Sequence, residues 1–361
     1  MSAPLTEKHV EIAGRRIGPG YPPYVIAELS ANHNGSLAAA LSLIEAAAEA
    51  GADAVKIQTY RADTITIDSD KPEFRIEGGL WDGQTLYELY EQAHTPWEWH
   101  SELFAKASDV GITMFSSPFD FTAVDLLEEL GAPAFKIASF EAVDLPLIRR
   151  VCGAGKPVII STGMSDEAEI ESAVDTARQA GCEELIVLHC VSGYPAPASD
   201  YNLRTLVDIG ARHDVVVGLS DHTLGNATAI AAIALGASVI EKHFTLDRDG
   251  GGPDDSFSLE PRELKALCRD SRIAWEALGE VDYTRKQSEK GNAQFRRSLY
   301  VVADVKAGDI VTPENVRSIR PGFGLAPQYY DEILGRRFAS DVSRATPVSW
   351  ELLTNADDGS S

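Results

Sequence analysis

The chain has 361 residues and a mass of 38.9 kDa, which suits a barrel-sized domain of about 250 residues followed by a small second domain. Hydrophobic residues make up 44% and charged residues 24% of the sequence, values that exclude a disordered or fibrous chain. With 32 Lys and Arg against 55 Asp and Glu, the formal net charge is −23, which excludes nucleic acid and anionic membranes as partners. An anionic substrate is not excluded, because a few buried cations can dominate one pocket.

The sequence has no feature of a membrane or secreted protein. It contains no apolar run of roughly 18 residues, and residues 1–16 lack the apolar core and cleavage site of a signal peptide. The four cysteines show no CxxC spacing, which is typical of reduced thiols and offers no ligand set for structural zinc. We therefore expect a cytoplasmic protein.

A repeated pattern predicts the main fold. Short apolar runs alternate with polar turns and amphipathic segments, two of which end at Gly51 and Gly236, as helices with left-handed C-terminal caps do. Near-continuous apolar strands separated by helices predict a parallel sheet covered on both faces, and eight such units predict a (β/α)8 TIM barrel. A doubly wound open sheet is the alternative, but no GxGxxG follows the first run. The runs span residues 24–32, 53–59, 112–118, 134–139, 157–162, 185–192, 215–222 and 239–244.

The remaining segments complete the expected domain organisation. Residues 8–20 are expected to form a short hairpin or plug at the bottom of a catalytic barrel domain spanning residues 1–283. The long, aromatic-rich connection at about residues 60–111 follows a strand and should lie over the barrel mouth, either packing there or touching substrate. A polar linker, 284–297, leads to a small β-rich domain with a short polar tail, 298–361, which is marginal for an independent core.

The ends of the expected strands are unusually polar. In such barrels all eight carboxyl ends meet at one mouth, so polar side chains there indicate a catalytic site. Two lysines with a ring of serines suit a phosphate or carboxylate, whereas the alternative interpretation pairs the lysines with carboxylates in structural layers. The candidates for anion binding are Lys56, Ser117, Lys136, Ser139, Ser161, Ser192 and Ser220.

Two histidines at successive strand ends form a candidate metal site. His222 and His243, with open positions, suit Mn²⁺, Fe²⁺, Co²⁺ or Zn²⁺, although each could instead be a hydrogen-bonded structural residue. Glu28 could be a third ligand, a base that orients water, or the partner of a lysine. Asp254 lies in a glycine-rich loop that is either a lid or a solvated turn, and Arg320 lies in a rigid RPGFG loop that could present it to a ligand.

Eight ordered motifs now carry a resemblance: AELSANHNGS, GADAVKIQTY, FSSPF, FKIAS, ISTGM, GLSDHT, EKHF and RPGFG. Together they resemble the sialic acid synthase family, the nonulosonate synthases that depend on phosphoenolpyruvate (PEP), over roughly residues 20–350. The segments ELSANH, GGLW, LYELYE, TPWEWH, KIASFE and IRPGFGL are most similar to the pseudaminic acid synthase branch, as is a serine at position 192. The resemblance implies a (β/α)8 barrel followed by a C-terminal antifreeze-like (SAF) domain.

The resemblance also implies roles for the candidate residues. PEP would condense with an amino-sugar aldehyde and be held by the seven anion-site residues named above. His222 and His243 would hold a divalent metal, Mn²⁺ before Mg²⁺ or Co²⁺, and Glu28 and Asp254 would be catalytic. Gln58, Tyr194 and Arg320 would contact the acceptor sugar, Arg320 from the SAF domain that caps the partner's barrel in a homodimer.

Three alternatives remain open from the sequence. The same mechanism serves legionaminate and N-acetylneuraminate synthases, and sugar stereochemistry cannot be deduced from these residues. A catalytically silent SAF-domain binding protein is a second possibility, but it would have no reason to retain Glu28, both lysines and both histidines. A metal-dependent barrel hydrolase or isomerase would leave the lysines and serines unexplained.

Overall fold

The computed structural model describes residues 8–354; the first residues of the chain and the expected polar tail lie outside the described part. The pattern of contacts divides the chain into two compact units, Met1–Gly279 and Glu280–Ser361. Within residues 8–354 no helix is both long enough and apolar enough to cross a membrane.

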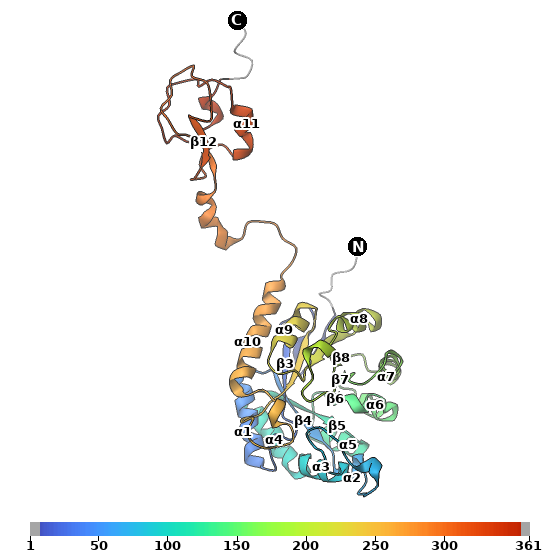
Figure 1. Cartoon of the computed structure of the whole chain (residues 1–361). Helices are drawn as coiled ribbons and strands as arrows, with labels where there is room; N and C mark the ends of the chain where they lie inside the picture. The colour runs from blue at the N-terminus through green and yellow to red at the C-terminus, as the bar shows by residue number, and fades with distance from the viewer. Residues whose placement is uncertain (1–7, 355–361) are drawn as a thin grey trace. The chain divides into compact units, whose positions relative to one another are not determined.

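The first unit is a closed barrel of eight parallel strands with helices around it, which confirms the predicted fold (Figure 1). Neighbouring strands follow the chain order from β3 to β10, and β10 closes the barrel by pairing with β3, His243 opposite Glu28. The strands are β3 Tyr24–Glu28, β4 Ala54–Thr59, β5 Thr113–Pro118, β6 Phe135–Ile137, β7 Val158–Ser161, β8 Leu185–Cys190, β9 Val216–Ser220 and β10 Val239–His243.

The barrel helices begin and end where local chemistry permits. In α1, the Ser36 side chain accepts from the Ala39 N–H, and Gly51 ends the helix with φ of 89°, a conformation that glycine adopts without strain. Gly236 likewise follows α9 with φ of 104°. The helices are α1 Leu37–Ala50, α4 His100–Val110, α5 Phe121–Glu129, α6 Leu145–Cys152, α7 Glu167–Gln179, α8 Arg204–His213, α9 Ala227–Ala234 and α10 Pro261–Leu278.

Several strands end earlier than the apolar runs. β3 stops at Glu28, and Ser30 then takes a left-handed conformation with φ of 43°, so Asn32 and His33 lie in the turn that precedes α1. Ser139 begins a short 3-10 helix, η3 Ser139–Glu141, instead of ending β6. The polar side chains therefore lie on strand tips and on the first residues beyond them, above the barrel mouth.

The bottom of the barrel is closed by the expected hairpin, β1 Val10–Ile12 and β2 Arg15–Ile17, which pair in antiparallel fashion. Val10, Ile12 and Ile17 share one hydrophobic cluster with inward-facing residues of the barrel strands, among them Phe115 and Val239. The hairpin thus removes the apolar lower layer of the barrel from water.

The long connection after β4 contains its own short helices. Trp97 Nε1 donates to the Tyr60 carbonyl oxygen at 3.2 Å, and the Arg61 guanidinium lies 4.0 Å from the Trp97 ring centroid. Trp81 Nε1 donates to the Pro253 carbonyl oxygen at 3.2 Å, which links this connection to the glycine-rich loop after β10. The helices are α2 Ala62–Ile65, η1 Pro72–Phe74, α3 Leu86–Ala93 and η2 Trp97–Trp99, and η4 Ala198–Asp200 and η5 Asp255–Phe257 lie in later loops.

The second unit has a small core of its own. Strands β11 Ser298–Val301 and β12 Val316–Ile319 pair in antiparallel fashion, and Leu299, Val316 and Phe338 belong to one buried cluster. The stretch expected as a linker contains a 3-10 helix, η6 Gln287–Phe295, whose Gln294 carbonyl accepts from the Gly322 N–H at 2.9 Å. The remaining elements are η7 Pro327–Tyr329, α11 Tyr330–Ile333 and η8 Trp350–Leu352.

Candidate active site

Two buried lysines and two buried glutamates form the charged centre of the mouth. Lys56 Nζ lies 2.5 Å from Glu28 Oε2 and 3.9 Å from Glu241 Oε2. Lys136 Nζ donates to both Glu241 oxygens, at 2.8 and 3.2 Å. All four side chains are at most 6% exposed. The pairing considered as the structural alternative is therefore present, and it places both ammonium groups at the mouth where an anionic substrate would meet them.

Opposing effects set the protonation of these four groups. Burial disfavours the charged form of Glu241, but Lys136 and Lys56 outweigh it and hold the Glu241 pKa at about 2. Burial raises the pKa of Glu28, with Lys56 opposing the shift, and burial lowers the pKa of Lys136, with Glu241 opposing. The Lys56 pKa is raised, because two glutamates overcome its desolvation. Glu28 is thus the carboxylate of the centre best suited to accept a proton.

A polar chain leads from Glu28 toward the glycine-rich loop. Gln58 Nε2 donates to Glu28 Oε1 at 2.9 Å and to Ser30 Oγ at 3.0 Å. Ser30 Oγ in turn donates to Asp254 Oδ2. Burial raises the pKa of Asp254 to about 6, and the Ser30 hydrogen bond opposes the shift. These hydrogen bonds bring together Glu28, Gln58 and Asp254, all three of which were predicted as site residues from the sequence.

The candidate serines divide into two groups. Ser117 Oγ accepts from Lys56 Nζ at 3.1 Å, and Ser220 Oγ donates to Glu241 Oε1 at 3.0 Å. The second group surrounds Gly163, where a methyl group in place of hydrogen would lie 2.1 Å from Ser192 Oγ and 2.7 Å from Ser139 Oγ. Ser139 Oγ accepts from the Gly163 N–H at 3.1 Å.

The Ser161 and Ser192 hydroxyls are buried without a hydrogen-bond partner among the described residues. Because a buried hydroxyl without a partner is costly, these two groups are poised for an external acceptor or donor.

The two candidate metal histidines lie together. The ring centroids of His222 and His243 are 5.4 Å apart. His222 Nδ1 lies 2.8 Å from the Val191 carbonyl oxygen, so Nδ1 carries a proton and Nε2 is the ring nitrogen left for a ligand. Burial opposes protonation of His222, but Cys190 and the Val191 carbonyl outweigh it and raise the His222 pKa. His243 Nδ1 is buried without a hydrogen-bond partner, 3.8 Å from Asp254 Oδ2. Burial lowers the pKa of His243 well below its usual value, so its imidazole is neutral, as a metal ligand must be.

Aromatic rings wall the site beside the histidines. The Tyr194 ring centroid lies 4.3 Å from that of His222 and 5.3 Å from that of Phe257. Trp81, from the long connection, lies 6.1 Å from Tyr194. The expected acceptor contact Tyr194 is therefore next to the candidate metal site, and Trp81 adds a contact between loops that the sequence alone left open.

Two residues of the site had been passed over in the list of candidates. Glu241 binds Lys136, Lys56 and Ser220, and its position in the same strand and on the same face as His243 was the available signal. Glu141, in η3, has a buried Oε2 without a hydrogen-bond partner, and burial raises its pKa to about 7. Nothing in sequence spacing marks Glu141, because it lies beyond a strand end.

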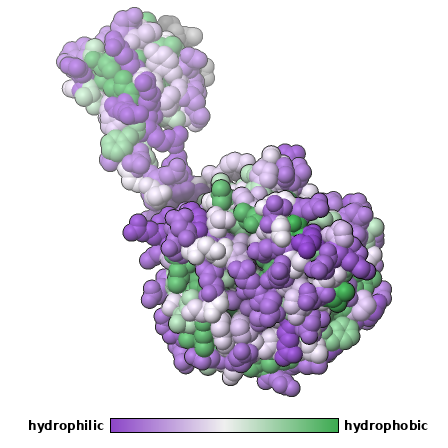
Figure 2. All heavy atoms as spheres, turned by 60° about the horizontal axis from the view of Figure 1, so that its bottom comes forward, coloured by the Kyte–Doolittle hydropathy of each residue, from purple (hydrophilic) through white to green (hydrophobic). Residues whose placement is uncertain are grey.

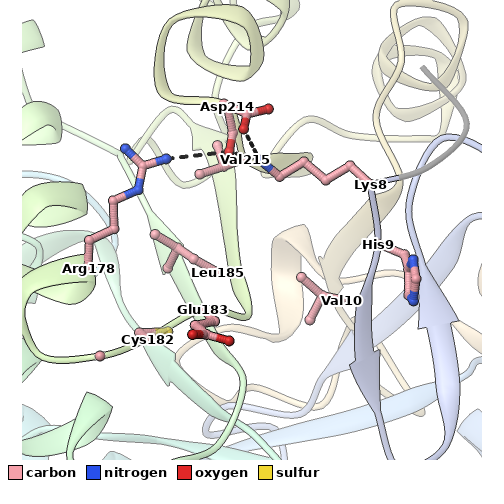
Figure 3. Close-up of a pocket in the computed structure, with 10 residues that line it drawn as sticks. Lys8, His9, Val10, Arg178, Cys182, Glu183, Leu185, Asp214 and Val215 are labelled. Atoms are coloured by element: carbon pink, nitrogen blue, oxygen red, sulfur yellow. Dashed lines mark hydrogen bonds and ion pairs between the residues drawn. The ribbon is translucent and has the colours of Figure 1, made fainter. Parts of the chain in front are cut away.

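Two further features belong to other parts of the chain. Arg320 follows β12 in the second unit and is exposed, with no side-chain hydrogen bond or ion pair to any described residue. A cavity of about 400 Å³ opens at the bottom of the barrel (Figure 3). Its Lys8 pairs with Asp214 at 2.7 Å, and its Arg178 donates to the His213 carbonyl, so its cations are already engaged.

Comparisons with known proteins agree with this architecture. The NeuB family matches residues 43–283 and the SAF domain matches residues 296–354. The chain is 46% identical over 319 residues to the pseudaminic acid synthase of Campylobacter jejuni, covering 88% of this chain and 93% of that protein. It is 39% identical over 316 residues to the N,N'-diacetyllegionaminic acid synthase of the same species, covering 86% and 94%.

One solved structure matches nearly the whole chain. The spore coat polysaccharide biosynthesis protein SpsE of Bacillus subtilis is 32% identical, with a TM-score of 0.65, covering 97% of this chain and 100% of that chain. Family match, relatives and barrel geometry agree over nearly the whole sequence. The chain belongs to the NeuB family of PEP-condensing nonulosonic acid synthases.

Proposed function

We propose that this chain is a pseudaminic acid synthase, which condenses PEP, water and 2,4-diacetamido-2,4,6-trideoxy-L-altrose to pseudaminic acid and phosphate. Higher identity to a pseudaminic acid synthase, 46%, than to a legionaminic acid synthase, 39%, supports this acceptor. Legionaminate and N-acetylneuraminate synthesis by the same mechanism are the nearest alternatives.

The main support for the proposal is that the mouth contains both two buried ammonium groups, of Lys56 and Lys136, and two buried serine hydroxyls without a hydrogen-bond partner in the described part of the chain, of Ser161 and Ser192. PEP bears a phosphate and a carboxylate, and Lys56 and Lys136 would meet these charges together with Ser117, Ser139, Ser161, Ser192 and Ser220. In a site removed from water such contacts also stabilise the charge that develops on the leaving phosphate. A metal-dependent hydrolase or isomerase would leave the two lysines and the serines unexplained, and absence of PEP binding would be its signature.

The histidine pair fits a divalent metal, and enzymes of this family are generally metal-dependent. The Val191 carbonyl engages His222 Nδ1 and leaves Nε2 as the nitrogen for a metal, and His243 Nδ1 is buried without a hydrogen-bond partner among the described residues. No group of three or more His, Cys, Asp or Glu side chains within residues 8–354 is arranged around one metal position. The two imidazoles would thus leave positions for water and substrate oxygen. Mn²⁺ is proposed, with Mg²⁺ or Co²⁺ as alternatives, and when bound it would supply Lewis acidity toward the aldehyde.

The protein side chains account for the remaining steps. C3 of PEP forms the new bond to the aldehyde carbon with the electrons of the C2=C3 double bond, and water adds to the electron-poor C2. Glu28, whose pKa is raised by burial, accepts one proton of this water and would pass it to the aldehyde oxygen, which becomes the new hydroxyl. The bond between C2 and the phosphate oxygen then breaks, and the C2 hydroxyl proton leaves with the phosphate as the ketone forms. Gln58, Tyr194 and Asp254 hold the sugar near the histidines. Exclusion of competing water requires a cover over the mouth.

A second copy of the chain is proposed as this cover. Exposed apolar side chains follow six of the eight barrel strands on the mouth side, where Figure 2 shows hydrophobic patches separated by hydrophilic surface. In a homodimer the SAF domain of one subunit would cap the other barrel, and the exposed Arg320 of the partner subunit would contact the sugar. The exposed apolar residues are Leu80, Phe121, Phe140, Val143, Met164, Leu224 and Leu246.

The test is Mn²⁺-dependent phosphate release from PEP, with the trideoxy-altrose derivative and N-acetylmannosamine assayed in parallel and each product weighed by mass spectrometry. Turnover with the first sugar alone is expected. Turnover with the second alone would contradict the pseudaminate assignment but keep the mechanism. Silence with both sugars and no PEP-induced rise in melting temperature would favour the catalytically silent binding protein.

A further inference from the structure

Behind the two candidate metal histidines, a buried ion pair joins the strands that carry them. Lys242 Nζ donates to Asp221 Oδ2 at 2.9 Å and to the Thr223 carbonyl oxygen at 2.7 Å. Asp221 Oδ1 accepts from the Thr223 N–H at 2.9 Å and from its hydroxyl at 2.8 Å. Lys242 and Asp221 are each 1% exposed. Lys242 therefore binds the residues immediately before and after His222.

The pair lies on the outer face of the barrel, opposite the active site. Side chains alternate between the two faces of a strand. Leu219 and Ile240, two residues before Asp221 and Lys242, pack in the hydrophobic layer shared with helices α9 and α10. Asp221 and Lys242 continue this outer row, whereas the neighbouring histidines continue the inner one. The ion pair and the two imidazoles are thus on opposite faces of the same two strand ends.

Stability alone gives little reason for a charged pair in this layer. The cost of removing two charges from water roughly cancels their attraction, and apolar side chains of similar volume often serve stability as well or better. Directional hydrogen bonds between charged groups do, however, select one geometry more strictly than apolar packing.

We propose that Lys242 and Asp221 are positioning residues that fix His222 relative to His243 for shared ligation of a divalent metal ion. The inference rests on the metal role proposed above for the two histidines. His222 is otherwise held by its N–H, which donates to the Tyr201 hydroxyl at 2.6 Å, and by the Val191 carbonyl at Nδ1. Both of these contacts come from the loop after β8, as does the Ala196 N–H that donates to the His222 carbonyl oxygen at 3.1 Å. The Lys242 contacts instead hold the backbone on either side of His222 to β10, the strand that carries His243.

The test compares Mn²⁺ binding, followed by the electron paramagnetic resonance of free Mn²⁺, in the full-length protein and its variants. Lys242→Met with Asp221→Asn removes both charges together and keeps an amide oxygen for Thr223. We expect Mn²⁺ affinity to fall about ten- to hundredfold, as for other groups that orient metal ligands. The PEP-induced melting shift without metal should persist, because the lysine and serine contacts are unchanged.

Two further variants keep the test decisive. Asp221→Asn alone nearly preserves volume and should give a smaller loss if the double variant does not fold. Arg15→Met with Asp53→Asn removes a partly buried ion pair at the opposite end of the barrel and should leave Mn²⁺ affinity within twofold of wild type. Wild-type affinity in the folded Lys242 and Asp221 variants would overturn the inference. If wild type binds no Mn²⁺, or His222→Ala binds it equally well, the proposed metal site itself fails and the inference with it.

Discussion

The two ends of the barrel are built from the same strands, but they differ in whether their polar groups are exposed or buried. At the bottom, the fully buried Ile12 and Ile17 close the barrel with apolar contacts, and the ion pair between Lys8 and Asp214 lies on the exposed rim. At the mouth, lysines, glutamates and serines are buried, and some hydroxyls have no partner among the described residues. Apolar burial stabilises the bottom, whereas the mouth bears a desolvation cost that a bound anion would offset.

The largest effect should come from breaking the charged centre of the mouth. Lys136→Met leaves Glu241 buried with Lys56 as its remaining cation, at 3.9 Å. Removing one partner of a buried pair costs about 3–5 kcal/mol of unfolding free energy, and synthase activity should fall at least about a thousandfold. Denaturant unfolding and phosphate release measure the two losses.

The matched change at the bottom is Lys8→Met, which removes an ion pair whose side chains are 42% and 87% exposed. Exposed pairs contribute about 0–1 kcal/mol, so both stability and activity should stay close to wild type. Equal effects of Lys136→Met and Lys8→Met would contradict the distinction between the two ends.

Weakening the apolar plug should separate stability from activity. Ile12 is 0% exposed in the cluster that closes the barrel bottom, so Ile12→Ala should reduce the free energy of unfolding by about 2–5 kcal/mol. At a temperature where the variant remains folded, its kcat/KM should match wild type, because the plug lies at the end of the strands away from the site. A loss of kcat/KM without a loss of stability would be the contrary result.

A further expected effect appears only in acid and concerns the pH dependence of stability. His100 is fully buried, Thr59 Oγ1 lies 2.8 Å from its Nε2, and burial lowers its pKa to about 4. The unfolded chain, with a histidine pKa near 6.5, binds the proton first as pH falls, so native stability decreases below about pH 6.5. His100 should account for about 2 kcal/mol of the loss between pH 7 and pH 5.

His100→Gln retains a hydrogen-bonding group but does not titrate in this range, so its unfolding free energy should fall less steeply between pH 7 and pH 5. Chemical unfolding curves at several pH values provide the comparison. Identical slopes for wild type and variant would show that His100 does not contribute.

Much of the candidate site could be predicted from the sequence, because its polar residues stand at the ends of the apolar runs that form the strands. Alternation within strands correctly grouped Lys56 with Gln58 and Glu241 with His243, because the period of a strand is two residues whatever its neighbours are. The significance of Glu241 could not be deduced in this way, since its partner Lys136 is 105 positions away in the chain. Glu141 could not be predicted either, because it lies beyond the end of β6, where side chains do not alternate with a regular period.

By itself, the sequence determined the barrel, its plug and the mouth on which the polar residues converge. Apolar runs, helix caps and polar strand ends are local properties, and eight repeats favour a closed barrel, which the structure shows. Only the tertiary structure decided which charges pair across the mouth and that Lys242 and Asp221 meet behind the histidines. These contacts depend on strand register and on β10 closing against β3, and the closure joins residues more than 200 positions apart in the chain.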